Sequence, residues 1–250
     1  MEQDVDGWDA GEPSATGDFF LPGTQYYQFC IGARTSPDGV YLTACNDRVD
    51  SPGEQGLDSD TDTTDTSTGR VLQATTTITT SLATLVQTYS FDVCSKRIRV
   101  DAELTNTGDS PLYDVAYAIG FDPDNDQETF GEYDTTDTIE GQASLGDDFT
   151  AVCAEGQDSG VSVCLSSDRT DSYAFRGEAF SANPIADKDP IDGVTLTTKD
   201  APPETDDLAI ALMTIEEGAL APGATSGNLG MYIGLGLEVD VVEPVNEICI

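Results

Sequence analysis

The chain has 250 residues, with 47 acidic residues against 10 lysines and arginines and no histidine, which gives a formal net charge of −37. This charge argues against a nucleic-acid partner and against an anionic membrane surface, since binding to either one needs clustered basic side chains. Because histidine is absent from the sequence, a Ser-His-Asp catalytic triad is excluded.

The distribution of the acidic residues predicts that the protein works in very salty water. The acids are spread along the whole chain and are not confined to a tail. At ordinary ionic strength their repulsion opposes a compact state, whereas molar salt shortens the Debye length to about 3 Å and screens it. The composition resembles that of proteins from salt-in halophilic archaea and from the viruses that infect them.

Six cysteines indicate disulfide bonds and an oxidising destination, because their number is even and the chain is rich in strand-forming sequence. No two of them form a CxxC pair, which disfavours a zinc or iron–sulfur site. Short separations predict the pairs Cys30–Cys45 and Cys153–Cys164, and elimination leaves Cys94 with Cys249. Buried free thiols are the alternative.

The order of polar and apolar residues predicts an all-β protein with little helix. Short runs alternate with a period of two between turn residues, and helical periodicity is almost absent. We therefore expect an antiparallel β-sandwich, jelly-roll-like or Ig-like, with long acidic loops. The predicted strands are 25–32, 39–45, 70–79, 82–92, 97–105, 113–121, 160–166, 208–215 and 227–235.

Residues 50–68 read DSPGEQGLDSDTDTTDTST and are predicted to form a long, exposed, acidic loop. This loop divides an N-terminal hairpin region (1–69) from the main sandwich domain (70–250). Residues 1–10 are acidic and lack the apolar stretch of a signal peptide, and no run of about 20 apolar residues predicts membrane insertion. Either a leader has been removed, or the protein leaves the cell without secretion, as virion proteins do.

Three turn motifs occur in a recognisable order: Asn-Thr-Gly at 106–108, Asp-Pro-Asp-Asn-Asp at 122–126 and Leu-Ala-Pro-Gly at 220–223. In this order they resemble a β-sandwich module of bacterial and archaeal surface proteins, adhesin-like repeats and some phage structural proteins. The resemblance spans roughly residues 82–237 and implies a fold and a surface setting, not a reaction. Gly108 can take positive φ in its turn, and Pro222 fixes φ while Gly223 is free to turn.

The alternating acids of the second motif, Asp122, Asp124 and Asp126, are candidate ligands for Ca²⁺ or another divalent cation, since carboxylate oxygens suit hard cations. The stretch lacks the glycine at the sixth position and the glutamate at the twelfth position of an EF-hand loop. The alternative is a turn capped by Asp or Asn side chains, with its acids in solvent.

No catalytic residues are predicted, and the leading hypothesis is a non-enzymatic structural surface component of a haloarchaeal virus particle. It would be a capsid decoration, turret, tail or fibre protein, homo-oligomeric, in contact with other virion proteins and located on the virion surface or outside the cell. A secreted or cell-surface adhesin-like module that binds host glycans is the alternative. The aromatic residues proposed for glycan contact are Tyr26, Tyr27, Phe29 and Tyr133, with core packing as the competing explanation.

Overall fold

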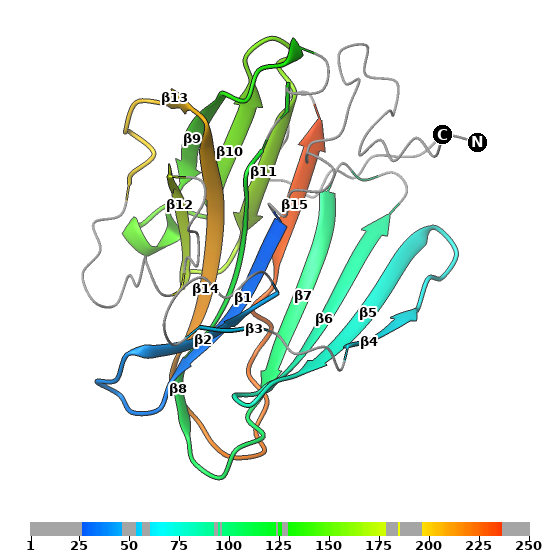
Figure 1. Cartoon of the computed structure of the whole chain (residues 1–250), viewed down its shortest axis with the longest axis vertical. Coiled ribbons are helices and arrows are strands. Elements are labelled where there is room, and N and C mark those ends of the chain that lie inside the picture. The colour runs from blue at the N-terminus through cyan, green and yellow to red at the C-terminus, as the bar shows by residue number, and fades with distance from the viewer. Residues whose placement is uncertain are drawn as a thin grey trace.

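The computed structural model describes residues 27–46, 54–56, 61–92, 95, 97–123, 125–126, 130–178, 185 and 197–236. Its strands form two sheets that face each other as layers (Figure 1). This arrangement confirms the predicted all-β sandwich.

Among the described residues, the first sheet has six strands in the order β12-β14-β8-β1-β2-β3, and the second has nine in the order β13-β9-β10-β11-β15-β7-β6-β5-β4. The six strands are β12 (Ser172–Glu178), β14 (Leu208–Leu220), β8 (Leu112–Phe121), β1 (Tyr27–Arg34), β2 (Tyr41–Cys45) and β3 (Glu54–Gly56). The nine strands are β13 (Glu204–Asp206), β9 (Thr135–Gly141), β10 (Thr150–Gly156), β11 (Ser162–Ser167), β15 (Met231–Gly236), β7 (Arg97–Thr105), β6 (Thr84–Asp92), β5 (Val71–Thr79) and β4 (Thr61–Asp65). The described ladders are antiparallel apart from the short parallel pairing of β2 with β3.

Strand β7 shows how the period of two builds the core. Val100, Ala102 and Leu104 are buried between the sheets, whereas Arg99 and Glu103 on the opposite face are exposed. The strand has the bounds and the half-buried character that its alternation predicts.

The six-stranded sheet is buried on both faces around β8 and β14. Tyr117 and Leu212 belong to the core between the two sheets, while their neighbours Ala118 and Met213 belong to a second apolar cluster. Successive strand residues point to opposite faces, so this second cluster lies on the outer face of the sheet. Ile185, which is fully buried, covers it. Burial on both faces explains why β14 begins with a continuous apolar run.

The Asn-Thr-Gly and Leu-Ala-Pro-Gly motifs meet at one end of the sandwich. The fully buried Asn106 side chain donates to the carbonyls of Ser110 and Leu220, both at 2.9 Å. The Gly223 N–H donates to the Asn106 carbonyl at 2.8 Å, and Gly223 takes a positive φ of 76°. Gly108 does not adopt positive φ; its N–H donates to Asn106 Oδ1, which closes the turn without left-handed backbone.

The predicted loop at 50–68 contains strands, so that part of the interpretation was wrong. β3 pairs with β2, and β4 pairs with β5 at the edge of the nine-stranded sheet. The three threonines of β4 favour extended backbone, and its two aspartates suit an edge strand, where charge discourages pairing with another chain. β1 pairs directly with β8, so the N-terminal hairpin is part of the sandwich and no division at residue 69 is visible in the strand pairing.

Two of the predicted disulfides are present. Cys30 and Cys45 face each other across the β1–β2 ladder, and Cys153 and Cys164 face each other across β10–β11. Their Cα atoms are 4.2 and 4.1 Å apart. In its described part, each sheet therefore carries a covalent link between neighbouring strands.

The third predicted pair, Cys94 with Cys249, lies outside the described residues. Within the described ranges, no helix is long and apolar enough to cross a membrane.

We expect the double variant Cys30→Ala/Cys45→Ala to lose roughly 3 kcal/mol of unfolding free energy, because the bond closes a loop of 15 residues and restricts the unfolded chain. Cys153→Ala/Cys164→Ala serves as the matched comparison and should lose slightly less, since its separation is 11 residues. Urea unfolding in molar salt measures both. An unchanged midpoint in both variants would contradict a stabilising role.

Candidate functional site

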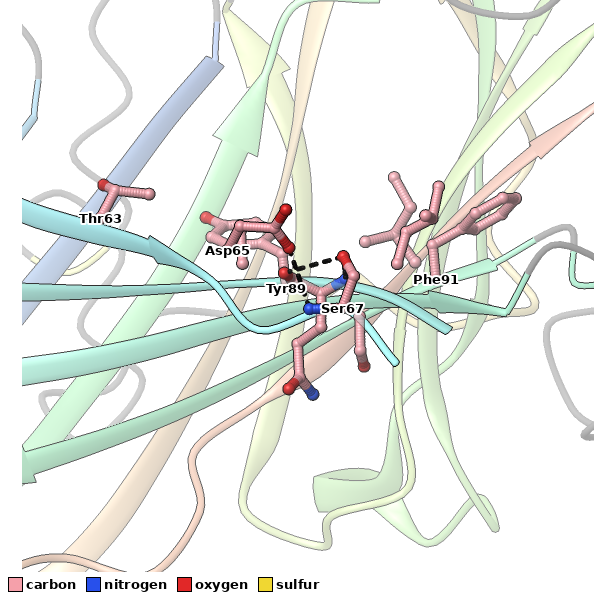
Figure 2. A pocket seen from close by; sticks show the side chains of 10 residues that line it. Thr63, Asp65, Ser67, Tyr89 and Phe91 are labelled. Carbon is pink, nitrogen blue, oxygen red and sulfur yellow. Dashed lines mark hydrogen bonds between the residues drawn. The ribbon is translucent and has the colours of Figure 1, made fainter. Parts of the chain in front are cut away.

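An apolar groove lies on the nine-stranded sheet, where β4, β5, β6 and β7 lie side by side. Leu72 is paired with Phe91, and Ala74 is paired with Tyr89. These four residues, with Ile98 of β7, form the apolar floor of the groove, which has a volume of about 440 Å³ (Figure 2). That volume is within the range of pockets that hold small ligands or short segments of chain.

The floor of the groove is on the inward face of the sheet. Ile78 of β5 and Leu85 of β6 are buried in the core between the sheets, and Leu72 and Phe91 share their face because residues two apart in a strand point the same way. Leu72 is nevertheless 54% exposed. The inward face is thus covered at one end of these strands and open at the other.

Polar groups at the rim of the groove bind one another. The Ser67 N–H donates to Asp65 Oδ1 at 2.9 Å, and the Gln73 N–H donates to the Ser67 hydroxyl at 3.0 Å (Figure 2). Thr66 donates to Gln73 Oε1 at 2.8 Å. The hydrogen bonds from Ser67 lower the pKa of Asp65 below its ordinary value. The rim is therefore an ordered polar edge around an apolar floor.

A second feature is the acidic end of the sandwich, where the structure places two of the predicted cation ligands. Asp122 and Asp126 are 4% and 1% exposed, so their side chains are not in solvent. Asp126 accepts the backbone N–H of Asp158 at 2.7 Å through Oδ2 and that of Ser159 at 3.2 Å through Oδ1. Asn125 donates to two carbonyls of the same hairpin, at 2.8 and 3.0 Å. The motif thus caps the β10–β11 turn, and its Asp122 and Asp126 are buried, unlike the solvated acids of the alternative interpretation.

The divalent-cation prediction stays untested by the described ranges. Asp124 lies outside them, and among the residues that are described no three acidic or cysteine side chains gather closely enough to hold a metal. A bound ion would stabilise the fold in proportion to its saturation. Thermal melting with and without EDTA at constant molar salt tests the prediction. An unchanged melting temperature would show that no divalent cation stabilises the fold.

We expect Asp126→Ala to destabilise the fold by about 2 kcal/mol, because two N–H groups of the β10–β11 turn lose their acceptor. Asp158→Ala is the matched control: it removes the same charge from an exposed position of that turn. Urea unfolding at molar salt compares them. Equal losses in the two variants would show that the capping bonds are unimportant.

Sequence reasoning missed Asp137, an inward-facing carboxyl on β9. The residue is fully buried, and burial raises its pKa to about 7. Thr135 donates to Oδ1 at 2.8 Å, while Oδ2 has no hydrogen-bond partner among the described residues. The charge of Arg176 favours the ionised form, and those of Asp122 and Glu204 oppose it. The one available signal was an aspartate at an inward position of an alternating strand.

Arg176 joins the two sheets beside Asp137. It extends from β12 of the six-stranded sheet and donates to the backbone carbonyl of Asp137 at 2.6 Å. A second nitrogen donates to the Pro202 carbonyl at 2.7 Å, and Nε lies 3.5 Å from Glu204. The guanidinium is therefore directed to backbone and to Glu204, and it makes no direct bond with the Asp137 carboxyl.

The aromatic residues proposed for glycan contact have separate locations. Tyr133 is 47% exposed, as is its neighbour Phe130. Phe29 packs against the core, which fits the alternative explanation. Tyr27 lies in β1, and Tyr26 is outside the described residues.

No family model and no curated protein matches this chain. Solved structures with some likeness include the Slr1438 protein from Synechocystis sp. PCC 6803, at 11% identity and a TM-score of 0.36. The match covers 71% of this chain and 66% of that one, just under two thirds of its length. A galactose mutarotase related enzyme from Lactobacillus acidophilus matches at 9% identity and a TM-score of 0.32, covering 83% of this chain and 79% of that one. Both TM-scores are below 0.5, so neither likeness carries an argument about reaction, ligand or partner.

Proposed function

We propose that this protein is a structural surface component of a haloarchaeal virus particle, where it stabilises the particle or contacts the host. The observation that carries the proposal is the covalent link in each sheet of the sandwich. Disulfides persist in oxidising surroundings outside the cell, and the net charge of −37 suits a solvent of molar salt. A non-catalytic role agrees with a sequence that has no histidine and no phosphate-binding loop motif.

The oligomeric state of the purified protein tests this role. A particle component is expected to form a ring, trimer or other closed assembly of fixed size. Light scattering coupled to size-exclusion chromatography in molar potassium chloride should therefore give one fixed multiple of 26.4 kDa. A monomer at every concentration tested would overturn the proposal.

A glycan-binding module is the second candidate, and it is favoured by the exposed pair Phe130 and Tyr133. Aromatic rings with one face in solvent can stack on sugar rings through apolar contact. Binding to a panel of host-surface polysaccharides should be lost in Phe130→Ala/Tyr133→Ala. Leu145→Ala is the matched control, because Leu145 is an exposed apolar residue (53%) elsewhere on the surface. Equal binding by all three proteins would remove this candidate.

A further inference from the structure

The apolar groove opens beside the connection between β6 and β7. Phe91 is the residue before the last of β6, and Ile98 is the second residue of β7. Both line the groove. Cys94 lies between them in sequence, three residues after Phe91. In the sequence, Cys94 therefore belongs to the connection between two strands that line the groove.

Strand β15 ends at this same end of the sheet. It runs antiparallel to β7, with Gly234 opposite Arg97, the first residue of β7. The last residue of β15, Gly236, therefore lies near the start of β7 (Figure 1). The chain continues for the 14 residues 237–250, which are outside the described ranges and include Cys249.

The C-terminal segment 237–250 is long enough to extend from the end of β15 across the groove to β5. β15 and β5 are separated by β7 and β6 in the sheet order, so three strand spacings lie between them, which is about 14 Å. Fourteen extended residues span up to about 46 Å. The segment can thus reach every residue of the groove floor and return to Cys94.

The chemistry of the segment fits the floor of the groove. It carries four acidic residues, Glu238, Asp240, Glu243 and Glu247, and between them the seven apolar residues Leu237, Val239, Val241, Val242, Val245, Ile248 and Ile250. The floor is formed by Leu72, Ala74, Tyr89, Phe91 and Ile98. Burying these two apolar surfaces against each other removes both from water.

We propose that residues 237–250 occupy the groove of their own chain and that Cys249 forms a disulfide with Cys94. Two thiols lose their protons and two electrons, and the disulfide of a thiol-exchange oxidant accepts both and becomes two thiols. The segment is then held at its far end by the covalent bond and along its length by apolar contact. This arrangement is independent of the proposed role in a particle.

Non-reducing peptide mapping of the full-length protein tests the covalent part. A peptide joining Cys94 to Cys249 is expected, in a protein that migrates as a single chain on a denaturing gel without reductant. Free thiols at either cysteine overturn the proposal. So does a Cys94–Cys249 bond between two chains, visible as a covalent dimer, because the groove would then hold the segment of a second copy.

Hydrogen exchange measured by mass spectrometry tests the packing. Leu72→Asp places a carboxylate on the groove floor, and the amides of residues 241–250 should then exchange about tenfold faster. Val40→Asp is the control, since Val40 is 77% exposed, outside the groove, between β1 and β2. The proposal fails if those amides already exchange at the unprotected rate in the wild type, or if Leu72→Asp and Val40→Asp give the same exchange.

Discussion

Lowering the salt concentration from about 1 M to about 0.1 M should unfold or aggregate the protein at room temperature. The Debye length grows from about 3 Å to about 10 Å over this range, so carboxylates that are screened from one another at high salt begin to repel. With 47 acids and 10 bases, the repulsion is spread over the entire chain and opposes the compact state. Circular dichroism during a stepwise dilution, followed by a return to molar salt, measures the effect.

The control for screening is an osmolyte. Sucrose at the same osmolality favours compact states by its exclusion from the protein surface but does not screen charge. We therefore expect sucrose to give little protection, whereas sodium and potassium chloride protect about equally. A melting temperature that stays constant from low to high salt would show that the charge is not the determinant of stability.

The second large effect is expected from Asp137→Asn. The native pKa of Asp137 is about 7 against an ordinary value of 3.8, so between these values the native state binds more protons than the unfolded state. Stability is therefore highest below about pH 4 and falls as the pH rises toward 7. The neutral amide of the variant avoids this loss, and its side-chain oxygen remains an acceptor for Thr135. The free energy of unfolding of the variant should exceed that of the wild type by up to roughly 4 kcal/mol at pH 8 and by almost nothing at pH 4.

Urea unfolding in molar salt at pH 4 and pH 8 measures this difference. Asp109→Asn is the matched control, because it makes the same change of charge at an exposed residue of the β7–β8 turn. A gain at pH 8 in Asp137→Asn that is equalled by Asp109→Asn would reflect the net charge alone. A loss at pH 8 would mean that the buried carboxylate is stabilised by a partner.

The fold class followed from local alternation, but only some of the strands did. β7 has one solvated face, so its charged and apolar residues alternate and its bounds were predicted correctly. β12 was missed. β9 and β10 were also missed, since threonine, alanine and glycine make up four of the seven residues of each strand and blur the contrast between its faces. β4 was interpreted as a loop because its sequence, Thr-Asp-Thr-Thr-Asp, has no apolar residue. A strand at the edge of a sheet can lack apolar residues, and β4 is such an edge strand.

The candidate sites, like the strands, were predictable only where the information is local in the sequence. The two disulfides within hairpins were predictable, because partners close in sequence are also close in the ladder. The capping role of Asp126 was not predictable, since the N–H groups that it accepts are 32 and 33 residues further along the chain. The groove depends on strand order, which brings β4 to β7 together at the open end of the sheet. No local pattern carries that information.

The position of Asn106 has a consequence for the time course of folding. Its side chain binds the carbonyl of Leu220, 114 residues away, and the two strands beside it pair with the late strands β14 and β15. That end of the sandwich cannot close until most of the chain has left the ribosome, and folds dominated by such distant contacts form slowly. We expect a long-lived, incompletely folded chain, whose high negative charge keeps it soluble and separate from other chains until its last strands arrive.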